Sequence, residues 1–339
     1  MGSIGFSEQI MKKKAFGALA AVLPLTLLFC ACGTSAVTLS ANWYKSGDGV
    51  NVGGKSERLE YEVTFEKTDE KIDTVDYKNG TYVTQLNAEA VKLSDQKTEV
   101  LGYHLHSELS VSVTYTVGND SQTFTDSVVS DVYFKTVSSH LQPIRSKKSV
   151  HTTSPVAVRP DTLDEAYEVY DYVYSVEYND ALSKAEIKFS SFLPETNTIE
   201  KSVSVRNRSA FFDNEQLLFV LRGMELDTSA ALTTIDPLGF QSRNVKILSP
   251  KAVGHTQAFT MNGTEIPASE EAPVKARSVV LMYDGTYSGQ PQKLVYAANT
   301  AQEKGGENVY RNALLSMEVP ILKGLGTLKY KLVNAEFND

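Results

Sequence analysis

The chain of 339 residues has almost no cysteine: Cys30 and Cys32 are the only two, and both lie in an N-terminal apolar stretch. The rest of the chain therefore has no disulfide, no zinc–thiolate site and no thiol nucleophile. Tryptophan is also scarce, with one residue, whereas there are 17 tyrosines and 14 phenylalanines. Tyrosine and phenylalanine are enriched in strands, so this imbalance favours a β-rich protein.

Positive charge and catalytic motifs are scarce as well. The formal net charge of −8 argues against binding to nucleic acid or to anionic lipid through charge alone. The sequence has no Gly-x-Ser-x-Gly elbow and no His-Glu-x-x-His motif. We therefore expect a protein that is not an enzyme and that uses no cofactor.

The apolar run from Ala15 to Phe29 is too short for a membrane-spanning helix, which needs ~20 residues. Three lysines, Lys12 to Lys14, precede the run, and small residues from Ala31 to Ser35 follow it. A basic segment, a short apolar segment and small residues at the cleavage site are typical of a secretory signal peptide. We expect residues 1–31 to be this signal, and residues 32–56, rich in Gly, Ser and Asn, to be a flexible tether.

Apolar and polar residues alternate with a period of two over much of residues 57–339. We expect this region to form an antiparallel β domain, which could divide into two halves near 160–200. The clearest run is Tyr103–Val117, in which apolar residues alternate with His104, His106 and other polar residues. One polar face per strand predicts an antiparallel sheet that is covered on one side. Turns are predicted at Asn79-Gly80, Gly118-Asn119-Asp120, Asn179-Asp180, Asn262-Gly263, Asp284-Gly285 and Gly305-Gly306.

The segment from Asp213 to Gly223 breaks this pattern. It has an N-cap residue, an early acid, an apolar stripe and a terminal glycine, which together predict a short helix. Long one-sided strands must either curl around such a helix or pack as a two-sheet sandwich. The strand count allows both architectures.

Four tyrosines share one face of a predicted strand near residue 174. Tyr170, Tyr172, Tyr174 and Tyr178, together with Val176 on the same face, would offer apolar area with a polar rim to a ligand. The same phenols could equally stabilise the sheet by packing across strands.

The pair His104-x-His106 has the spacing of two metal ligands on one strand face. No acid or third histidine is obviously nearby, so solvated histidines are the favoured interpretation. We therefore expect no metal site.

The residues Leu27-Leu28-Phe29-Cys30-Ala31-Cys32 resemble the lipobox of bacterial lipoproteins. In that family a cysteine becomes the first mature residue and carries acyl chains. The resemblance implies lipidation at Cys32, after the small Ala31, and an extracytoplasmic protein anchored to a bacterial membrane. Cys30 is the competing position but follows bulky Phe29, which also stands where the family usually has Leu. An ordinary signal peptide cut near Ala36 is the alternative.

The order of elements over residues 57–337 resembles the half-barrel carriers of the bacterial envelope, namely lipoprotein-localisation proteins and the DUF3108-type family. Three pieces carry the resemblance: Val132–Phe134 continuing into a Leu-x-Pro turn within Ser139–Ser146, the helix Asp213–Arg222, and Tyr287–Leu294. The resemblance implies a mainly β fold, a strongly curved antiparallel sheet or half-barrel with one short capping helix. It implies no catalytic residues.

These observations lead to one functional expectation and one alternative. The expectation is a membrane-anchored lipoprotein that binds a lipid or another hydrophobic molecule in its concave sheet. The ligand would contact Tyr170, Tyr172, Tyr174, Val176, Leu217, Leu218 and Leu221. The alternative is a structural or adhesive cell-surface module without a small-molecule ligand. The sequence does not identify a protein partner.

Overall fold

The structure is a computed structural model that describes residues 56–93, 97–137, 140–193, 195–223, 229–283, 291–298, 310–321 and 324–338. All of them belong to one compact unit, residues 36–339. Cys30, Cys32 and the signal and tether segments lie outside the described residues. Among the residues described, no helix is long and apolar enough to cross a membrane.

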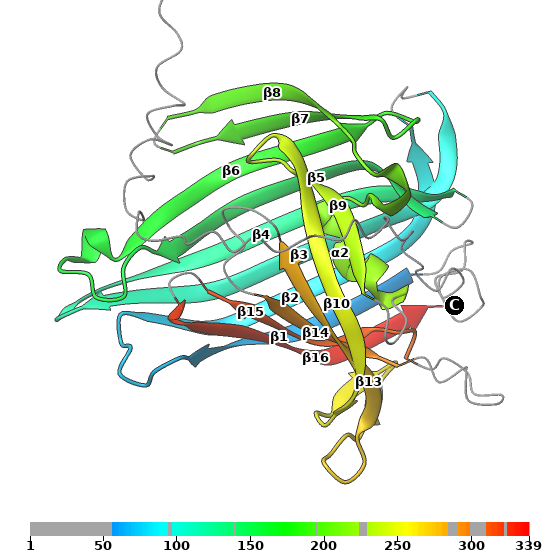
Figure 1. Cartoon of the computed structure of the whole chain (residues 1–339). Helices are drawn as coiled ribbons and strands as arrows, with labels where there is room; N and C mark the ends of the chain where they lie inside the picture. Colours follow the sequence, from blue (N-terminus) through cyan, green and yellow to red (C-terminus); the bar gives the residue numbers. More distant parts are fainter. Residues whose placement is uncertain are drawn as a thin grey trace, which may run out of the picture. The chain divides into compact units, whose positions relative to one another are not determined.

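The described strands form one curved sheet, which confirms the predicted antiparallel fold and excludes the two-sheet sandwich (Figure 1). The strand order is β8-β7-β6-β5-β4-β3-β2-β1-β16-β15-β14-β13-β10-β9, and a small β11–β12 hairpin pairs with β16 off this path. The strands are β1 (Ser56–Lys67), β2 (Val75–Lys92), β3 (Glu99–Val117), β4 (Asp120–Val137), β5 (His140–Pro155), β6 (Tyr167–Tyr178), β7 (Lys184–Ser191), β8 (Asn197–Ser204), β9 (Ala230–Asp236), β10 (Gln241–His255), β11 (Phe259–Met261), β12 (Thr264–Ile266), β13 (Val274–Tyr283), β14 (Gln292–Ala297), β15 (Leu314–Pro320) and β16 (Gly326–Asn338).

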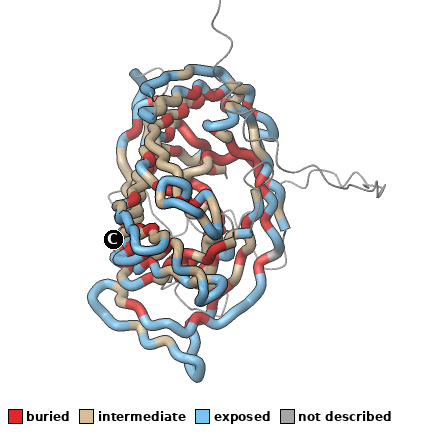
Figure 2. Tube along the Cα trace, turned by 90° about the vertical axis from the view of Figure 1, so that its left-hand side faces the viewer, coloured by how far each residue is buried: buried red, intermediate tan, exposed pale blue. Residues whose placement is uncertain are grey.

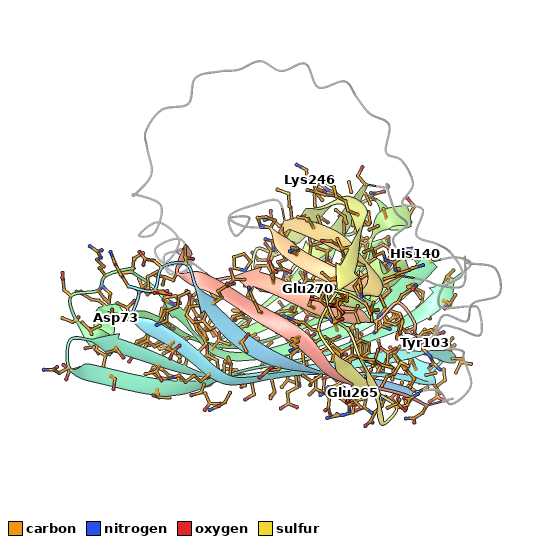
Figure 3. All side chains as sticks on the ribbon, turned by 90° about the horizontal axis from the view of Figure 1, so that it is seen from below. Asp73, Tyr103, His140, Lys246, Glu265 and Glu270 are labelled. Atoms are coloured by element: carbon orange, nitrogen blue, oxygen red, sulfur yellow. The ribbon has the colours of Figure 1, made fainter. Side chains whose placement is uncertain are left out.

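The long strands bury one face, as their alternating sequences predict. On β3, Tyr103, Leu105 and Val113 are buried, whereas His104 and His106 on the opposite face remain half-buried. Figure 2 shows that exposed residues are most frequent at the turns and strand ends. In Figure 3, Asp73, which precedes β2, and Tyr103 lie at opposite ends of the long strands. One continuous ladder through β5, β6 and β7 crosses the region near 160–200.

Several predicted turns connect strands as expected. The residues Gly118-Asn119 join β3 to β4, and a turn that starts at Asn179-Asp180 joins β6 to β7. Asn262 and Gly263 join β11 to β12 with φ values of 49° and 76°. Positive φ at both central residues is the signature of the type I′ hairpin turn. Asp284-Gly285 and Gly305-Gly306 lie outside the described residues.

The predicted turn at Asn79-Gly80 is wrong, because both residues lie inside β2. The register of β2 against β3 shifts between Lys78 and Thr81, which marks a β-bulge. A Cβ atom on Gly80 would lie 2.6 Å from the carbonyl oxygen of Val63 on β1. This close approach of two backbones, and not a chain reversal, explains the glycine.

The predicted Leu-x-Pro turn is also wrong, because Leu141 and Pro143 belong to β5. Pro143 pairs with Phe134, where the register between β4 and β5 shifts. A proline lacks the N–H that a regular ladder needs, and an irregular position in the ladder tolerates it.

The sheet does not close into a barrel, because its end strands β8 and β9 do not pair with each other among the described residues. Side chains cross this seam instead: Ser242 Oγ on β10 donates a hydrogen bond of 3.0 Å to the carbonyl oxygen of Ser204 on β8. A second hydrophobic cluster, which includes Tyr178, Phe211 and Ile235, fills the space beside the seam. The seam is therefore held by side chains and by one isolated backbone bridge between Phe211 and Thr233, and not by a continuous backbone ladder.

Candidate functional site

The helical segment, residues 214–223, is the single described stretch with α-helical structure inside the sheet (Figure 1). It consists of a 3-10 turn (η3, Asn214–Gln216), one α-helical turn (α2, Leu217–Val220) and another 3-10 turn (η4, Leu221–Gly223). Asp213 caps it: its Oδ1 accepts a 2.8 Å hydrogen bond from the Glu215 N–H, and Gln216 Oε1 accepts one of 3.2 Å from the Asp213 N–H. This capping box confirms the predicted short helix and its start.

Strands that are far apart in the sheet converge on the helical segment. From β5, the Leu141 carbonyl accepts a 3.1 Å hydrogen bond from Gln216 Nε2. From β14, the hydroxyl of Tyr296 donates one of 2.9 Å to the Leu218 carbonyl. From β13, the guanidinium of Arg277 donates a hydrogen bond to the Arg222 carbonyl. Because β5 and β13 are well separated in the strand order, the sheet must wrap around the helical segment.

The N-terminal end of the helical segment carries a buried carboxylate. Asp213 Oδ2 accepts hydrogen bonds from the Tyr178 hydroxyl (2.6 Å) and from Ser146 Oγ (2.7 Å). Burial and the neighbouring charge of Glu215 raise the pKa of Asp213 to about 6, although these hydrogen bonds act in the opposite direction.

Glu215 is the second buried acid of this end. Its Oε1 accepts hydrogen bonds from the Tyr174 hydroxyl (2.6 Å) and Asn214 Nδ2 (3.0 Å), and Lys148 Nζ lies 3.2 Å from both carboxylate oxygens. Burial raises the pKa of Glu215, but the charge of Lys148 and the hydrogen bond from Tyr174 outweigh it and hold the pKa below its ordinary value.

The C-terminal end of the helical segment carries a buried cation, Arg222. Its Nη1 donates a 2.9 Å hydrogen bond to Glu57 Oε2 on β1, and its Nη2 donates to the other carboxylate oxygen. The side chains of Arg222 and Glu57 are only 5% and 3% exposed. Burial lowers the pKa of Arg222, but the charge of Glu57 outweighs it and raises the pKa. Asn312 Nδ2 also donates to the Arg222 carbonyl, at 3.2 Å.

A cavity lies between the helical segment and strands β1 to β3. The space inside it that is open to a water-sized molecule is about 30 Å³, and the surrounding gaps between atoms, open solvent included, bring the total to about 390 Å³. The residues that line it are Leu59, Tyr61, Tyr82, Thr84, Leu105, Ser107, Glu215, Leu218, Phe219, Arg222 and Leu314.

The charged and phenolic groups of this lining already have partners. The Tyr61 hydroxyl donates a 2.9 Å hydrogen bond to the Leu314 carbonyl, and the Tyr82 hydroxyl bonds with Ser107. Burial raises the pKa of Tyr82 to about 12, so its phenol stays neutral. A molecule in the cavity would therefore gain mostly from contact with the leucines and Phe219.

The structure divides the predicted ligand-lining residues between different surroundings. Leu218 lines the cavity, whereas Leu217 and Leu221 are fully buried in the main core. Tyr174 and Val176 belong to the second cluster beside the seam, and Tyr172 packs against it. The Tyr170 hydroxyl donates a 2.8 Å hydrogen bond to Glu168. No sequence motif identifies the residues of β1 to β3, including Tyr82, as lining a cavity.

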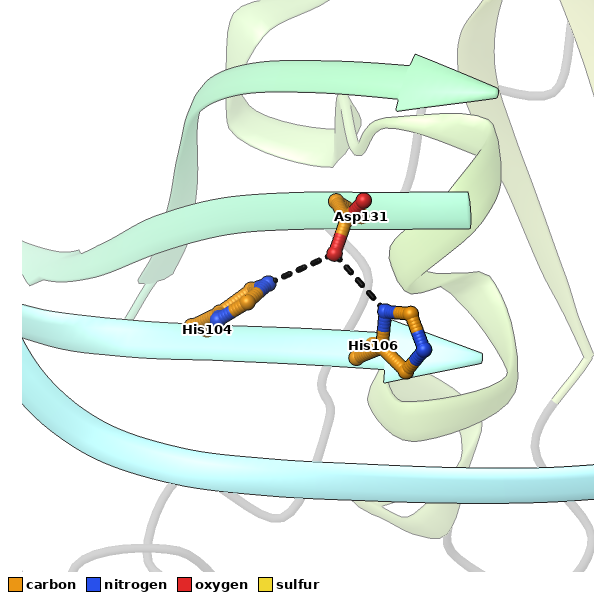
Figure 4. Close-up of side chains that lie close together, drawn as sticks. All are labelled: His104, His106 and Asp131. Atoms are coloured by element: carbon orange, nitrogen blue, oxygen red, sulfur yellow. Dashed lines mark hydrogen bonds and ion pairs between the residues drawn. The ribbon is translucent and has the colours of Figure 1, made fainter. Parts of the chain in front are cut away.

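The two histidines of β3 have an acidic partner that sequence reasoning did not find. Asp131 on β4 lies between them, and its Oδ1 is 2.8 Å from both His104 Nε2 and His106 Nδ1 (Figure 4). The premise that no acid lies nearby is therefore wrong. Burial raises the pKa of Asp131, but hydrogen bonds from both histidines outweigh it and hold the pKa below its ordinary value.

One sequence motif lies outside the described residues except for its last residue, Ser56. Gly49 to Ser56 has the spacing of a phosphate-binding loop, Gly-x₄-Gly-Lys-Ser. In such a loop the lysine and serine open a helix, whereas Ser56 begins strand β1. This context argues against a nucleotide site.

Comparison with solved structures finds a likeness in fold. The crystal structure of a β-barrel-like protein of a domain of unknown function, DUF1849, from Brucella abortus is similar, with a TM-score of 0.47 and 14% sequence identity. The match covers 84% of this chain and 98% of that one. No protein-family model matches the chain, and no curated protein sequence does.

Proposed function

We propose that this chain is an extracytoplasmic lipoprotein, anchored through Cys32, that binds a hydrophobic molecule without chemical turnover. The observation that carries the binding proposal is the cavity beneath the helical segment. Its apolar lining is formed by Leu59, Leu105, Leu218, Phe219 and Leu314, and its charged groups are paired within the protein. A cavity of this kind favours a ligand with little polar surface.

The ligand would be slender, because the helical segment occupies much of the space inside the sheet. Leu218 is the helical residue best placed to decide what fits, since it is half-buried and lines the cavity. A single hydrocarbon chain, with its polar end toward solvent, would enter only if the cavity widened around it, because the space open to a water-sized molecule is about 30 Å³. Each methylene that it buries would contribute about 0.8 kcal/mol.

The anchor is tested by Cys32→Ser. We expect wild-type protein in the membrane fraction and the variant in the soluble fraction, because the acyl chains attached through Cys32 supply the membrane affinity. Membrane fractionation followed by mass spectrometry of the N-terminal peptide measures both location and lipidation. Cys30→Ser is the matched control and should stay in the membrane; retention of Cys32→Ser would contradict the assignment.

Ligand binding is tested by Leu218→Trp, which adds volume inside the cavity. Native mass spectrometry of the membrane-extracted protein should detect about one hydrophobic molecule per chain, and a fluorescent fatty acid should bind to ligand-depleted protein. The substitution should weaken binding by about fivefold to 150-fold, since overpacking a filled site costs ~1–3 kcal/mol. Leu101→Trp, at an exposed position of β3, should leave binding unchanged.

One observation favours the second candidate, a structural or adhesive module. The hydrogen bonds at both ends of the helical segment tie it to β5, β13 and β14, which seals much of the concave face. The same experiments separate the two functions. No co-purified molecule and no fatty-acid binding to the wild-type protein would favour the adhesive module.

A further inference from the structure

We propose that His104, His106 and Asp131 form a binding site for a divalent transition-metal ion of the Zn²⁺ class. The site lies on the outer face of β3 and β4. It is separate from the cavity, because Leu105 and Ser107 point to the cavity while the two histidines point away on the other face of the same strand. The proposal is therefore independent of the ligand-binding function.

The β3–β4 pairing is what creates the site. His104 and His106 share a face because they are two residues apart on a strand. In the antiparallel register, Asp131 lies directly opposite His106, and Tyr133 lies directly opposite His104. Two imidazoles and a carboxylate are therefore fixed on two adjacent, hydrogen-bonded strands, which is a more rigid support than a loop.

The distances suit a single bound ion. One carboxylate oxygen of Asp131 is 2.8 Å from a ring nitrogen of each histidine, and the three ligand atoms lie within 4.8 Å of one another. In a tetrahedral Zn²⁺ site with bonds of ~2.0–2.1 Å, ligand atoms are separated by about 3.3 Å. Small rotations of the three side chains bring the atoms to that separation without a change in the strand register.

Two neighbours orient His104 as metal-bound histidines are oriented. The Tyr133 ring stacks on the imidazole, with 4.2 Å between centroids and 8° between planes. Glu89 Oε1 on β2 lies 3.8 Å from Nδ1, the ring nitrogen that does not face Asp131. A carboxylate beside the second nitrogen of a ligating histidine fixes the ring and raises its basicity.

The donor set indicates the class of ion. Ca²⁺ and Mg²⁺ prefer oxygen ligands, whereas imidazole nitrogens favour Zn²⁺, Cu²⁺ and Ni²⁺. Three protein ligands leave a fourth position for water, as in an open zinc site. Solvent reaches the site, since the side chains are 19% (His104), 34% (His106) and 30% (Asp131) exposed. Within the ranges that the structure describes, no other group of three or more His, Cys, Asp and Glu side chains converges in this way.

The chain also offers a matched control. His151 and Asp171 form a surface pair 3.6 Å apart on β5 and β6. This pair has the same chemistry but only two members. If surface His–Asp pairs in general took up the ion, His151→Ala would lower metal binding as much as a change in the site.

The test is a titration of the full chain, purified in detergent without a polyhistidine tag. Zn²⁺ is measured by competition with a chromophoric chelator, and Co²⁺ by its visible absorption. We expect one Zn²⁺ per chain and a Co²⁺ spectrum of low coordination number. His106→Ala and Asp131→Asn should each weaken Zn²⁺ binding more than about tenfold, and Glu89→Gln about tenfold, within the ~10–100-fold range for outer partners of a ligand.

Metal-free variants are compared by circular dichroism, so that a folding defect is separated from the loss of a ligand. Asp131→Asn keeps the shape and polarity of the side chain. In the case that His106→Ala does not fold, Asp131→Asn is the variant on which the test depends. His151→Ala should bind Zn²⁺ as the wild type does. Failure of the wild type to bind Zn²⁺ more tightly than Asp131→Asn, or equal losses in His151→Ala and His106→Ala, would overturn the proposal.

Discussion

Replacing Arg222 by Ala is expected to lower the free energy of unfolding by ~3–5 kcal/mol, the usual effect of breaking a buried ion pair. The substitution leaves the Glu57 carboxylate at a position where its side chain is 3% exposed and its two charged hydrogen bonds are gone. It also removes the guanidinium that lies over the Phe219 ring, 5.3 Å from its centroid. Urea unfolding followed by circular dichroism measures the change.

Two further variants identify the cause of this loss. The double variant Glu57→Leu/Arg222→Met replaces the pair by apolar side chains and should recover much of the stability, because no unpaired charge remains buried. Lys188→Ala breaks the exposed pair of Lys188 with Glu200, whose side chains are 59% and 66% exposed. It should change the free energy of unfolding by less than about 1 kcal/mol. If Arg222→Ala were as mild as Lys188→Ala, the helical segment would not depend on this ion pair.

The second large effect concerns pH and Asp213. Its pKa is about 6 in the folded chain, against about 3.9 for an unfolded one. Between these values the folded state holds a proton that the unfolded state has lost. The part of the unfolding free energy that Asp213 contributes is therefore fully present below its pKa in the unfolded chain. It is lost as the pH rises through its pKa in the folded chain. At 1.36 kcal/mol per pKa unit, the loss between about pH 4 and pH 7 is ~3 kcal/mol.

Asp213→Asn should remove this part of the pH dependence, because the amide does not titrate. The quantity to compare is the change in unfolding free energy between pH 4 and pH 7 in the two proteins, since other buried acids, such as Asp126 with a pKa of about 6, contribute to both. Ser146→Ala removes a hydrogen bond that lowers the pKa of Asp213 and should move the loss to higher pH. Identical pH dependence in wild type and Asp213→Asn would contradict the argument.

Local features of the fold could be predicted from the sequence. The alternation in Tyr103–Val117 marked strand β3, and the cap and apolar stripe from Asp213 marked the helical segment. Both signals depend on neighbours within a few residues. The Asn79-Gly80 pair shows the limit of such signals, because the same dipeptide suits a turn and a bulge, and only the approach of Val63 decides between them.

The metal-ligand cluster could have been found by counting residues from the β3–β4 turn. Gly118-Asn119 is a two-residue turn, and the β3–β4 ladder has no register shift. His106 lies as far before Val117 as Asp131 lies after Asp120, so the two must face each other. The predicted turn at Gly118-Asn119 therefore already implies the partner of His106.

The cavity and its ion pair could not have been found in this way. Glu57 and Arg222 are 165 residues apart, and nothing in either local sequence indicates the other. Their meeting depends on β16 pairing with β1 and on the sheet curling until β5 and β13 reach the same helical segment. Long-range curvature of this kind results from the summed twist of many strands, which no short pattern encodes.

The seam between β8 and β9 has a mechanical consequence. A closed barrel has a radius fixed by its strand number and stagger, and it can widen only by breaking backbone hydrogen bonds. In this sheet the edges are joined by side-chain contacts such as that of Ser242 with Ser204 and by one isolated backbone bridge between Phe211 and Thr233. Separating β8 from β9 would therefore break these contacts and no complete strand ladder, so the width of the interior is set by side-chain packing at the seam and not by strand number.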